Sequence, residues 1–135
     1  MWGRGRRRAA LALGLAVAAG PALALAGGGV ADALAKLEHG RWQVRSASQA
    51  AVQHSLCLGD PTLLFQLEHG LRGCSQQVVG ADERHATVEY VCPGRGFGHT
   101  TVRVETSTTA TIDTQGFVDG HPFSYRATAR KLSDC

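Results

Sequence analysis

The sequence predicts a mainly β protein: a small antiparallel meander, curled into a half-barrel, with one or two short helices and two disulfides. Three observations predict this class. Apolar and polar residues alternate with period two in several runs, short turn-like connectors separate these runs, and four cysteines follow an apolar N-terminal stretch. Alternation gives each strand one face to bury, and short connectors favour antiparallel pairing between neighbouring strands.

Four runs carry the alternation most clearly, and each should form a strand. They are residues 41–45, 86–91, 102–105 and 123–130. The last run is the longest, with Phe123, Tyr125, Ala127 and Ala129 as its apolar members. The connectors are expected at residues 80–82, 93–96 and 119–120. Glycine in each connector is typical of a tight turn.

Two short helices are expected outside these runs. Val30, Leu34 and Leu37 recur at helical spacing, and Gly40 should end that helix. Asp60-Pro61 predicts the start of a second helix, which should end at Gly70. The tetrapeptide Leu-Glu-His-Gly closes both segments, at 37–40 and 67–70. We interpret it as a helix ending, because histidine suits the C-terminal dipole and glycine the left-handed cap.

The first 26 residues have the order of a secretory signal peptide. Four arginines lie within the first eight residues, the run 9–19 is apolar apart from Gly14, and Ala24-Leu25-Ala26 is a small-x-small cleavage site. The expected division is therefore a signal peptide over 1–26, a flexible start with a short helix over 27–40, and one disulfide-linked antiparallel β domain over 41–135. An uncleaved anchor is the alternative. Cleavage near Ala26 would make the protein periplasmic or secreted, in a bacterium, with no stable membrane anchor.

Cleavage also changes the charge of the chain. The full sequence has 14 Lys+Arg against 11 Asp+Glu, a net charge of +3. Loss of the four N-terminal arginines leaves 10 against 11, a net charge of −1. The basic character is thus a feature of the signal, and no nucleic-acid partner is expected.

The four cysteines can be paired by geometry. Residue 83 is the midpoint between Cys74 and Cys92, so a hairpin turn at 81–84 would place these two cysteines opposite each other. Cys57 and Cys135 are then left to pair, which would tie the last strand to the segment before the second helix. The spacings contain no Cys-x-x-Cys, so a zinc site is not expected.

Other motifs that resemble chemistry do not predict a catalytic, metal or cofactor site. Arg95-Gly96-Phe97-Gly98 matches half of an RNA-recognition signature, but the following stacking aromatics are missing. The six histidines never lie two or four residues apart, and we expect them on the surface. The best remaining candidate for a functional site is a rim formed by His99, Asp119 and His121, if adjacent hairpin ends bring these residues together.

From Cys57 onward the pattern resembles a bacterial exported family, domain of unknown function 3617; with Trp42 the resemblance covers about residues 40–135. The matching segments are Trp42, Cys57-Leu58, Leu64-Phe65-Gln66-Leu67, Cys74-Ser75, Tyr90-Val91-Cys92-Pro93-Gly94, Gly96-Phe97-Gly98-His99-Thr100, Val104-Glu105-Thr106, Gln115-Gly116, Pro122-Phe123 and Cys135. The chain departs from the family at its end, where Leu132-Ser133-Asp134 lacks a turn glycine. The resemblance implies a small exported domain and transfers no activity or catalytic residue.

The predicted function is non-enzymatic binding or interaction in the cell envelope. The apolar sheet face could hold a small apolar ligand or an envelope protein. The residues predicted to contact such a ligand are Tyr90, Val102, Phe123 and Tyr125. Two alternatives stay open: a purely structural or stress-related exported protein, and a small hydrolase.

Overall fold

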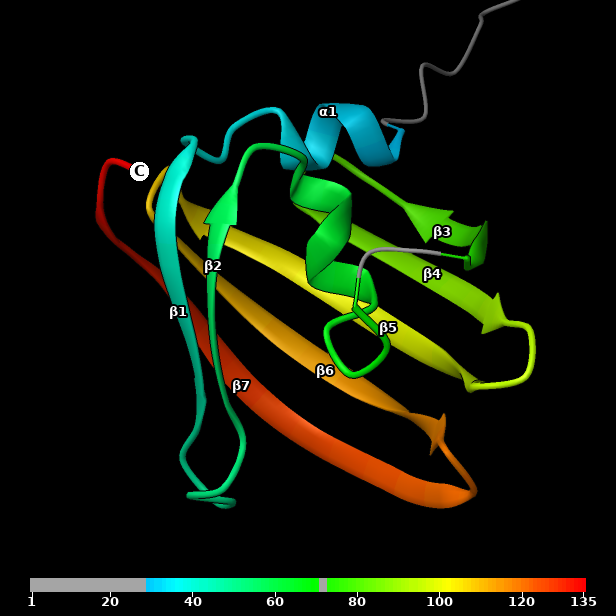
Figure 1. Ribbon diagram of the computed structural model, residues 1–135. Helices are drawn as coiled ribbons and strands as arrows, with labels where there is room; N and C mark the ends of the chain where they lie inside the picture. The colour runs from blue at the N-terminus through cyan, green and yellow to red at the C-terminus, as the bar shows by residue number, and fades with distance from the viewer. Residues whose placement is uncertain (1–28, 71–72) are drawn as a thin grey trace, which may run out of the picture.

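The computed structural model describes residues 29–70 and 73–135 (Figure 1). The predicted signal peptide therefore lies outside the described residues. In chain order the elements are α1 (Val30–Leu34), β1 (Gly40–Ser46), β2 (Gln53–Leu58), the 3-10 helix η1 (Pro61–Phe65), β3 (Ser75–Ala81), β4 (His85–Cys92), β5 (Gly96–Thr106), β6 (Thr109–Val118) and β7 (His121–Ser133). Neither helix of this part of the chain has the length and apolarity to cross a bilayer.

All seven strands form one open antiparallel sheet. Their order is β2-β1-β7-β6-β5-β4-β3, so β3 to β7 make a continuous meander and the β1–β2 hairpin is added beside β7. The sheet curls so that η1 lies in its concave side, while α1 crosses one end (Figure 1). The predicted fold class is confirmed.

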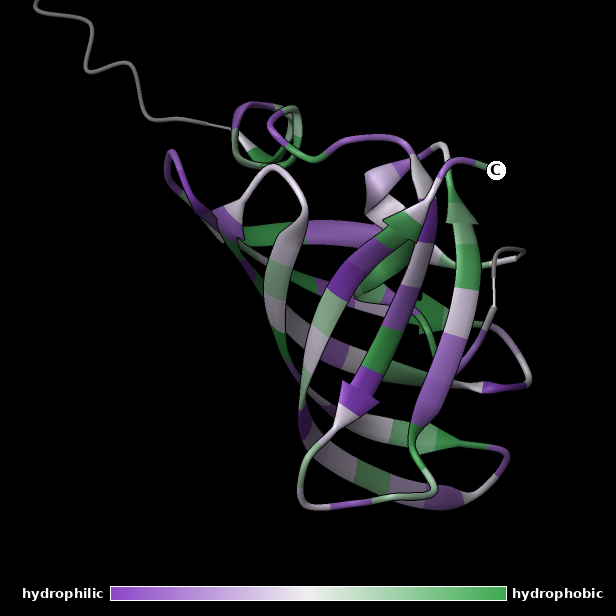
Figure 2. Cartoon of the chain, turned by 90° about the vertical axis from the view of Figure 1, so that its left-hand side faces the viewer, coloured by the Kyte–Doolittle hydropathy of each residue, from purple (hydrophilic) through white to green (hydrophobic). Residues whose placement is uncertain are grey.

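The core lies between the concave face of the sheet and the two helices. Apolar and polar residues alternate along the strands (Figure 2), and apolar members of the four predicted runs are buried: Trp42, Val88, Val102, Tyr125 and Ala129. The segment before the sheet belongs to the same core, since α1 and the turn after it contribute further buried residues: Ala33, Leu34 and Leu37.

Both helices end earlier than predicted. The first stops at Leu34, after which the Glu38 N–H donates to the Ser107 carbonyl and draws the chain onto the β5–β6 turn. The second is a 3-10 helix that stops at Phe65. The Phe65 carbonyl accepts a hydrogen bond from the Thr100 hydroxyl, 2.7 Å away, so a partner on the sheet satisfies a group that a longer helix would have used.

Two strands were not predicted. The first half of β2, Gln53-His54-Ser55, is polar on both faces and so has no apolar alternation. In β6 the inward positions include Thr114 and Gly116, which blur the apolar pattern. The Thr114 hydroxyl is nevertheless satisfied inside the core, 2.6 Å from that of Thr100.

The predicted disulfides are both present: Cys74–Cys92 and Cys57–Cys135. Ser75 pairs with Val91, which places Cys74 and Cys92 opposite each other at the end of the β3–β4 hairpin, as predicted. Arg41 of β1 lies between Cys57 on β2 and Ser133 on β7. The second disulfide therefore spans β1 and fixes the end of the chain to the edge of the sheet.

Candidate ligand-binding groove

Three parallel rows of residues cross strands β4, β5, β6 and β7 at one end of the sheet. The strand register fixes these rows, because each residue lies opposite its partner on the next strand. The inner row is Tyr90, Gly98, Gly116 and Phe123. The polar row is Glu89, His99, Gln115 and Ser124, and the apolar row is Val91, Phe97, Phe117 and Pro122. Since side chains alternate between faces, the polar and apolar rows share the outer face of the sheet.

The apolar row carries two neighbouring aromatic side chains. Phe97 is 51% exposed and Phe117 is 44% exposed, whereas Phe123 of the inner row is half-buried. The two ring centroids lie 5.5 Å apart, with 39° between the ring planes. Together they form an aromatic platform that water covers in the free protein.

All three rows line one groove with a volume of about 560 Å³. Its walls are mostly apolar, and Glu89 is the one acidic side chain among the described residues that line it. His99 lies beside it, with Nδ1 3.4 Å from the Glu89 carboxylate. Lys and Arg are absent from these lining residues. The groove thus combines an aromatic platform with hydrogen-bonding groups of little net charge.

The inner row explains why two glycines stand side by side in the sheet. A Cβ at Gly98 would collide with the ring of Tyr90, and a Cβ at Gly116 would collide with the Phe97 carbonyl. The sequence predicts a flexible or bulged hairpin end at Gly94, Gly96 and Gly98. Gly94 and Gly96 do have positive φ angles there, whereas Gly98 lies inside β5 and makes room for Tyr90.

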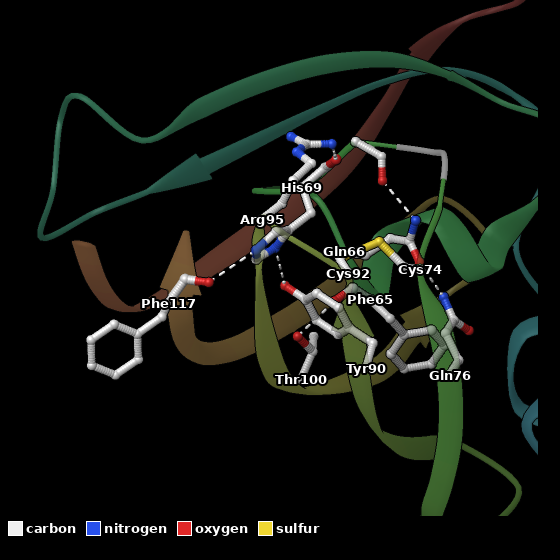
Figure 3. The surroundings of a disulfide bond; sticks show 11 residues. Phe65, Gln66, His69, Cys74, Gln76, Tyr90, Cys92, Arg95, Thr100 and Phe117 are labelled. Carbon is white, nitrogen blue, oxygen red and sulfur yellow. Dashed lines mark hydrogen bonds between the residues drawn. A yellow bond between two sulfur atoms is a disulfide. The ribbon is translucent and has the colours of Figure 1, made fainter. Parts of the chain in front are cut away.

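His69 anchors the floor of the groove from the concave side (Figure 3). It is fully buried, which corrects the expectation that all six histidines are on the surface. Its Nε2–H donates to the Phe117 carbonyl at 2.9 Å, because a carbonyl can only accept. In the neutral ring Nδ1 then accepts from the Tyr90 hydroxyl, 3.0 Å away. The sequence did not reveal this role, since His69 lies near the end of a predicted helix, in a tetrapeptide whose other copy carries the exposed His39.

The segment that carries His69 is itself held by side chains. Arg95 donates to the His69 carbonyl at 2.6 Å, and Gln66 donates to the Gly70 carbonyl at 2.6 Å (Figure 3). Gln76 on β3 in turn donates to the Gln66 side chain at 2.7 Å. Backbone groups outside regular structure are satisfied in this way, so the segment has a defined position against the sheet.

The predicted ligand-contact residues separate into two groups. Tyr90 and Phe123 line the groove, whereas Val102 and Tyr125 are buried in the core away from it. Burial, together with the charge of Glu68, raises the pKa of Tyr90 to about 12. That these four residues bind a ligand stays a prediction, but Val102 and Tyr125 are buried in the core of the concave face on which it was based.

A second polar cluster lies around Glu68. Its carboxylate accepts from the Tyr125 hydroxyl at 2.8 Å and lies 3.0 Å from His54 Nε2. Burial, and then the hydrogen bond to Glu68, raise the pKa of Tyr125 well above its usual value. This cluster joins β2, the segment after η1 and β7, and we interpret it as a structural link between them.

The rim predicted from His99, Asp119 and His121 does not form a cluster. His99 lies opposite Gln115, whereas His121 lies opposite Val118, farther along β6. His121 Nδ1 lies 3.0 Å from the Asp119 backbone carbonyl oxygen, not from the Asp119 carboxylate. Within residues 29–70 and 73–135, no three His, Cys, Asp or Glu side chains are grouped to hold a metal ion.

Sequence reasoning missed the aromatic platform, although a signal for it exists. Phe97 and Phe117 occur in phase with the polar residues of their strands, such as Arg103 and Asp113. An aromatic residue that alternates in step with the polar residues of a strand lies on the exposed face of the sheet.

Comparisons with protein-family models, with curated proteins and with solved structures find no match to this chain.

Proposed function

We propose that the chain is an exported, non-catalytic binding protein whose ligand occupies the groove on the outer face of the sheet. The observation that carries this proposal is the pair of exposed rings, Phe97 and Phe117, beside a row of polar side chains. Exposed aromatic side chains next to hydrogen-bonding groups are typical of recognition surfaces.

A non-catalytic role fits the state of the groove's titratable groups. Glu89 and His99 have side chains 58% and 44% exposed, so water surrounds both. Catalytic acids and bases are usually desolvated and held at hydrogen-bond distance from a reacting group. Ser124, the hydroxyl-bearing residue of the polar row, lies next to neither Glu89 nor His99, because Gln115 separates it from His99 in the strand register.

Export rests on the N-terminal sequence and on the two disulfides. Disulfides persist in oxidising compartments outside the cytosol. We propose the periplasm or the secreted fraction as the destination, with cleavage after Ala26. N-terminal sequencing of the protein from an envelope extract should give Gly27 or a residue close to it, whereas an intact N-terminus in the membrane fraction would support the anchor.

Binding at the groove can be tested with N-phenyl-1-naphthylamine, a neutral apolar probe that fluoresces when it leaves water. The wild-type protein should enhance its fluorescence, and the variant Phe97→Ala/Phe117→Ala should lose most of the enhancement. Val78→Ala is the matched control, because Val78 is an apolar side chain 54% exposed on a strand that does not line the groove.

Equal enhancement by both variants would place the probe elsewhere and would contradict the proposal. No enhancement by the wild-type protein would favour the alternative of a purely structural exported protein. The observation that supports this alternative is the buried core on the concave face, where the inward residues pack against one another.

A further inference from the structure

We infer that the groove binds an uncharged carbohydrate chain, an inference that rests on the proposed binding function. The apolar C–H face of a sugar ring would stack on Phe97 and Phe117. Its hydroxyl groups would meet the polar row formed by Glu89, His99, Gln115 and Ser124. The two rows run side by side across the same four strands, so one extended ligand would contact both.

The polar row offers both hydrogen-bond donors and acceptors. Gln115 and Ser124 each provide both, while Glu89 only accepts. Sugar hydroxyls also donate and accept, so each side chain of the row would find a partner. A hydrocarbon chain in the same place would cover these groups without replacing their hydrogen bonds to water, which disfavours its binding.

The charge of the groove argues against an anionic ligand. Glu89 is acidic, and the described lining residues include neither Lys nor Arg. A phosphate or carboxylate would therefore meet a like charge and no counter-charge, which disfavours binding. A neutral sugar requires no counter-charge.

The size and stiffness of the groove suit a short oligosaccharide. Four adjacent strands span about 14 Å at the usual strand spacing. The floor is held from behind by the His69 hydrogen bond to the Phe117 carbonyl and at the side by the Cys74–Cys92 disulfide. A preformed platform loses little conformational entropy when it binds a ligand, which favours recognition of a weakly interacting ligand.

The test is a titration of the ¹⁵N-labelled full mature protein with four trisaccharides, followed by amide chemical shifts. Maltotriose, cellotriose and triacetylchitotriose are the neutral probes, and trigalacturonate is the anionic one. At least one neutral probe should shift amides of β5 and β6 around Phe97 and Phe117, and trigalacturonate should not. Phe97→Ala should weaken that binding by about tenfold, as expected for a central stacking side chain. Gln115→Ala should weaken it less, and Val78→Ala should leave it unchanged.

Three outcomes would overturn the inference. If the fluorescent probe binds the groove but no neutral trisaccharide does, the carbohydrate assignment is wrong while the binding function stands. If trigalacturonate binds as well as the neutral sugars, the charge argument is wrong. If sedimentation shows a dimer that Phe97→Ala dissociates, a second copy of the chain occupies the groove. Failure of both the probe and the sugars would remove the proposed function itself.

Discussion

His39 and His69 occupy the same place in two copies of the tetrapeptide Leu-Glu-His-Gly, yet their environments are opposite. His39 is exposed, whereas His69 is fully buried between Tyr90 and the Phe117 carbonyl. A buried polar side chain is tolerated when its hydrogen bonds are complete, and both ring nitrogens of His69 have partners. At the scale of single residues, the surroundings set by the sheet decide what each histidine does.

Replacement of His69 by Ala should lower the free energy of unfolding by about 3 kcal/mol. The substitution leaves a cavity, and it leaves the Tyr90 hydroxyl and the Phe117 carbonyl without their partner. His39→Ala is the matched control and should change stability by less than about 0.5 kcal/mol. Urea denaturation of the two variants measures the difference. Equal losses would show that the buried network contributes little.

Tyr90 should make the fold sensitive to alkali. The pKa of its phenol is raised to about 12, above the unfolded value of about 10. The stability due to the neutral phenol is therefore fully present below about pH 10 and is lost as the pH rises toward about 12, a loss on the order of 3 kcal/mol. Urea midpoints measured from about pH 9 upward should fall over this range. The fall should be smaller for Tyr90→Phe, with the remainder due to Tyr125, whose pKa is raised in the same direction. A pH profile unchanged by Tyr90→Phe would contradict this assignment.

The strands are the elements that local sequence predicted best. Alternation identified β1, β4, β5 and β7, and the midpoint between two cysteines identified the β3–β4 hairpin. Strand β6 was not predicted because Thr114 and Gly116 occupy inward positions. Hydrogen bonds and close packing take the place of large apolar side chains there. The lengths of both helices depended on distant partners, such as Thr100 and Ser107, which no local pattern reveals.

A substitution at Gly98 would test how closely β5 packs against the Tyr90 ring of β4 at the groove. Gly98→Ala would push its Cβ into the ring of Tyr90, which the hydrogen bond to His69 holds in place. We expect a loss of about 1–3 kcal/mol, the usual range for overpacking. Gly59→Ala is the control, since a Cβ there meets nothing within 4 Å and needs no unusual backbone angle. Thermal unfolding would compare the two, and an equally small effect of both substitutions would show that Tyr90 can move aside.

At the scale of the whole molecule, the strand register of the sheet creates the groove, which the sequence did not predict. The groove exists because four strands align three rows of residues, and the identity of each row depends on every turn between them. The positions of the four cysteines predicted both disulfides, which the structure confirms. Export stays a prediction from the N-terminal pattern. The groove could be found only from the structure, since a slip of one residue in β5 or β6 would move Phe97 or Phe117 to the other face.

Of the two disulfides, Cys57–Cys135 should contribute more to the free energy of unfolding. It joins residues separated by 78 positions, whereas Cys74 and Cys92 are separated by 18. Chain-entropy estimates give about 4.5 kcal/mol for the longer loop and about 3 kcal/mol for the shorter one. The variant Cys57→Ala/Cys135→Ala should therefore unfold at lower urea concentration than Cys74→Ala/Cys92→Ala. The longer link also holds β2 and the chain end on both sides of β1, so its loss should raise amide exchange in β2 and β1 before β5 and β6. The opposite order of stability, or amide exchange that rises first in β5, would show that the β2–β1–β7 edge of the sheet does not depend on this disulfide.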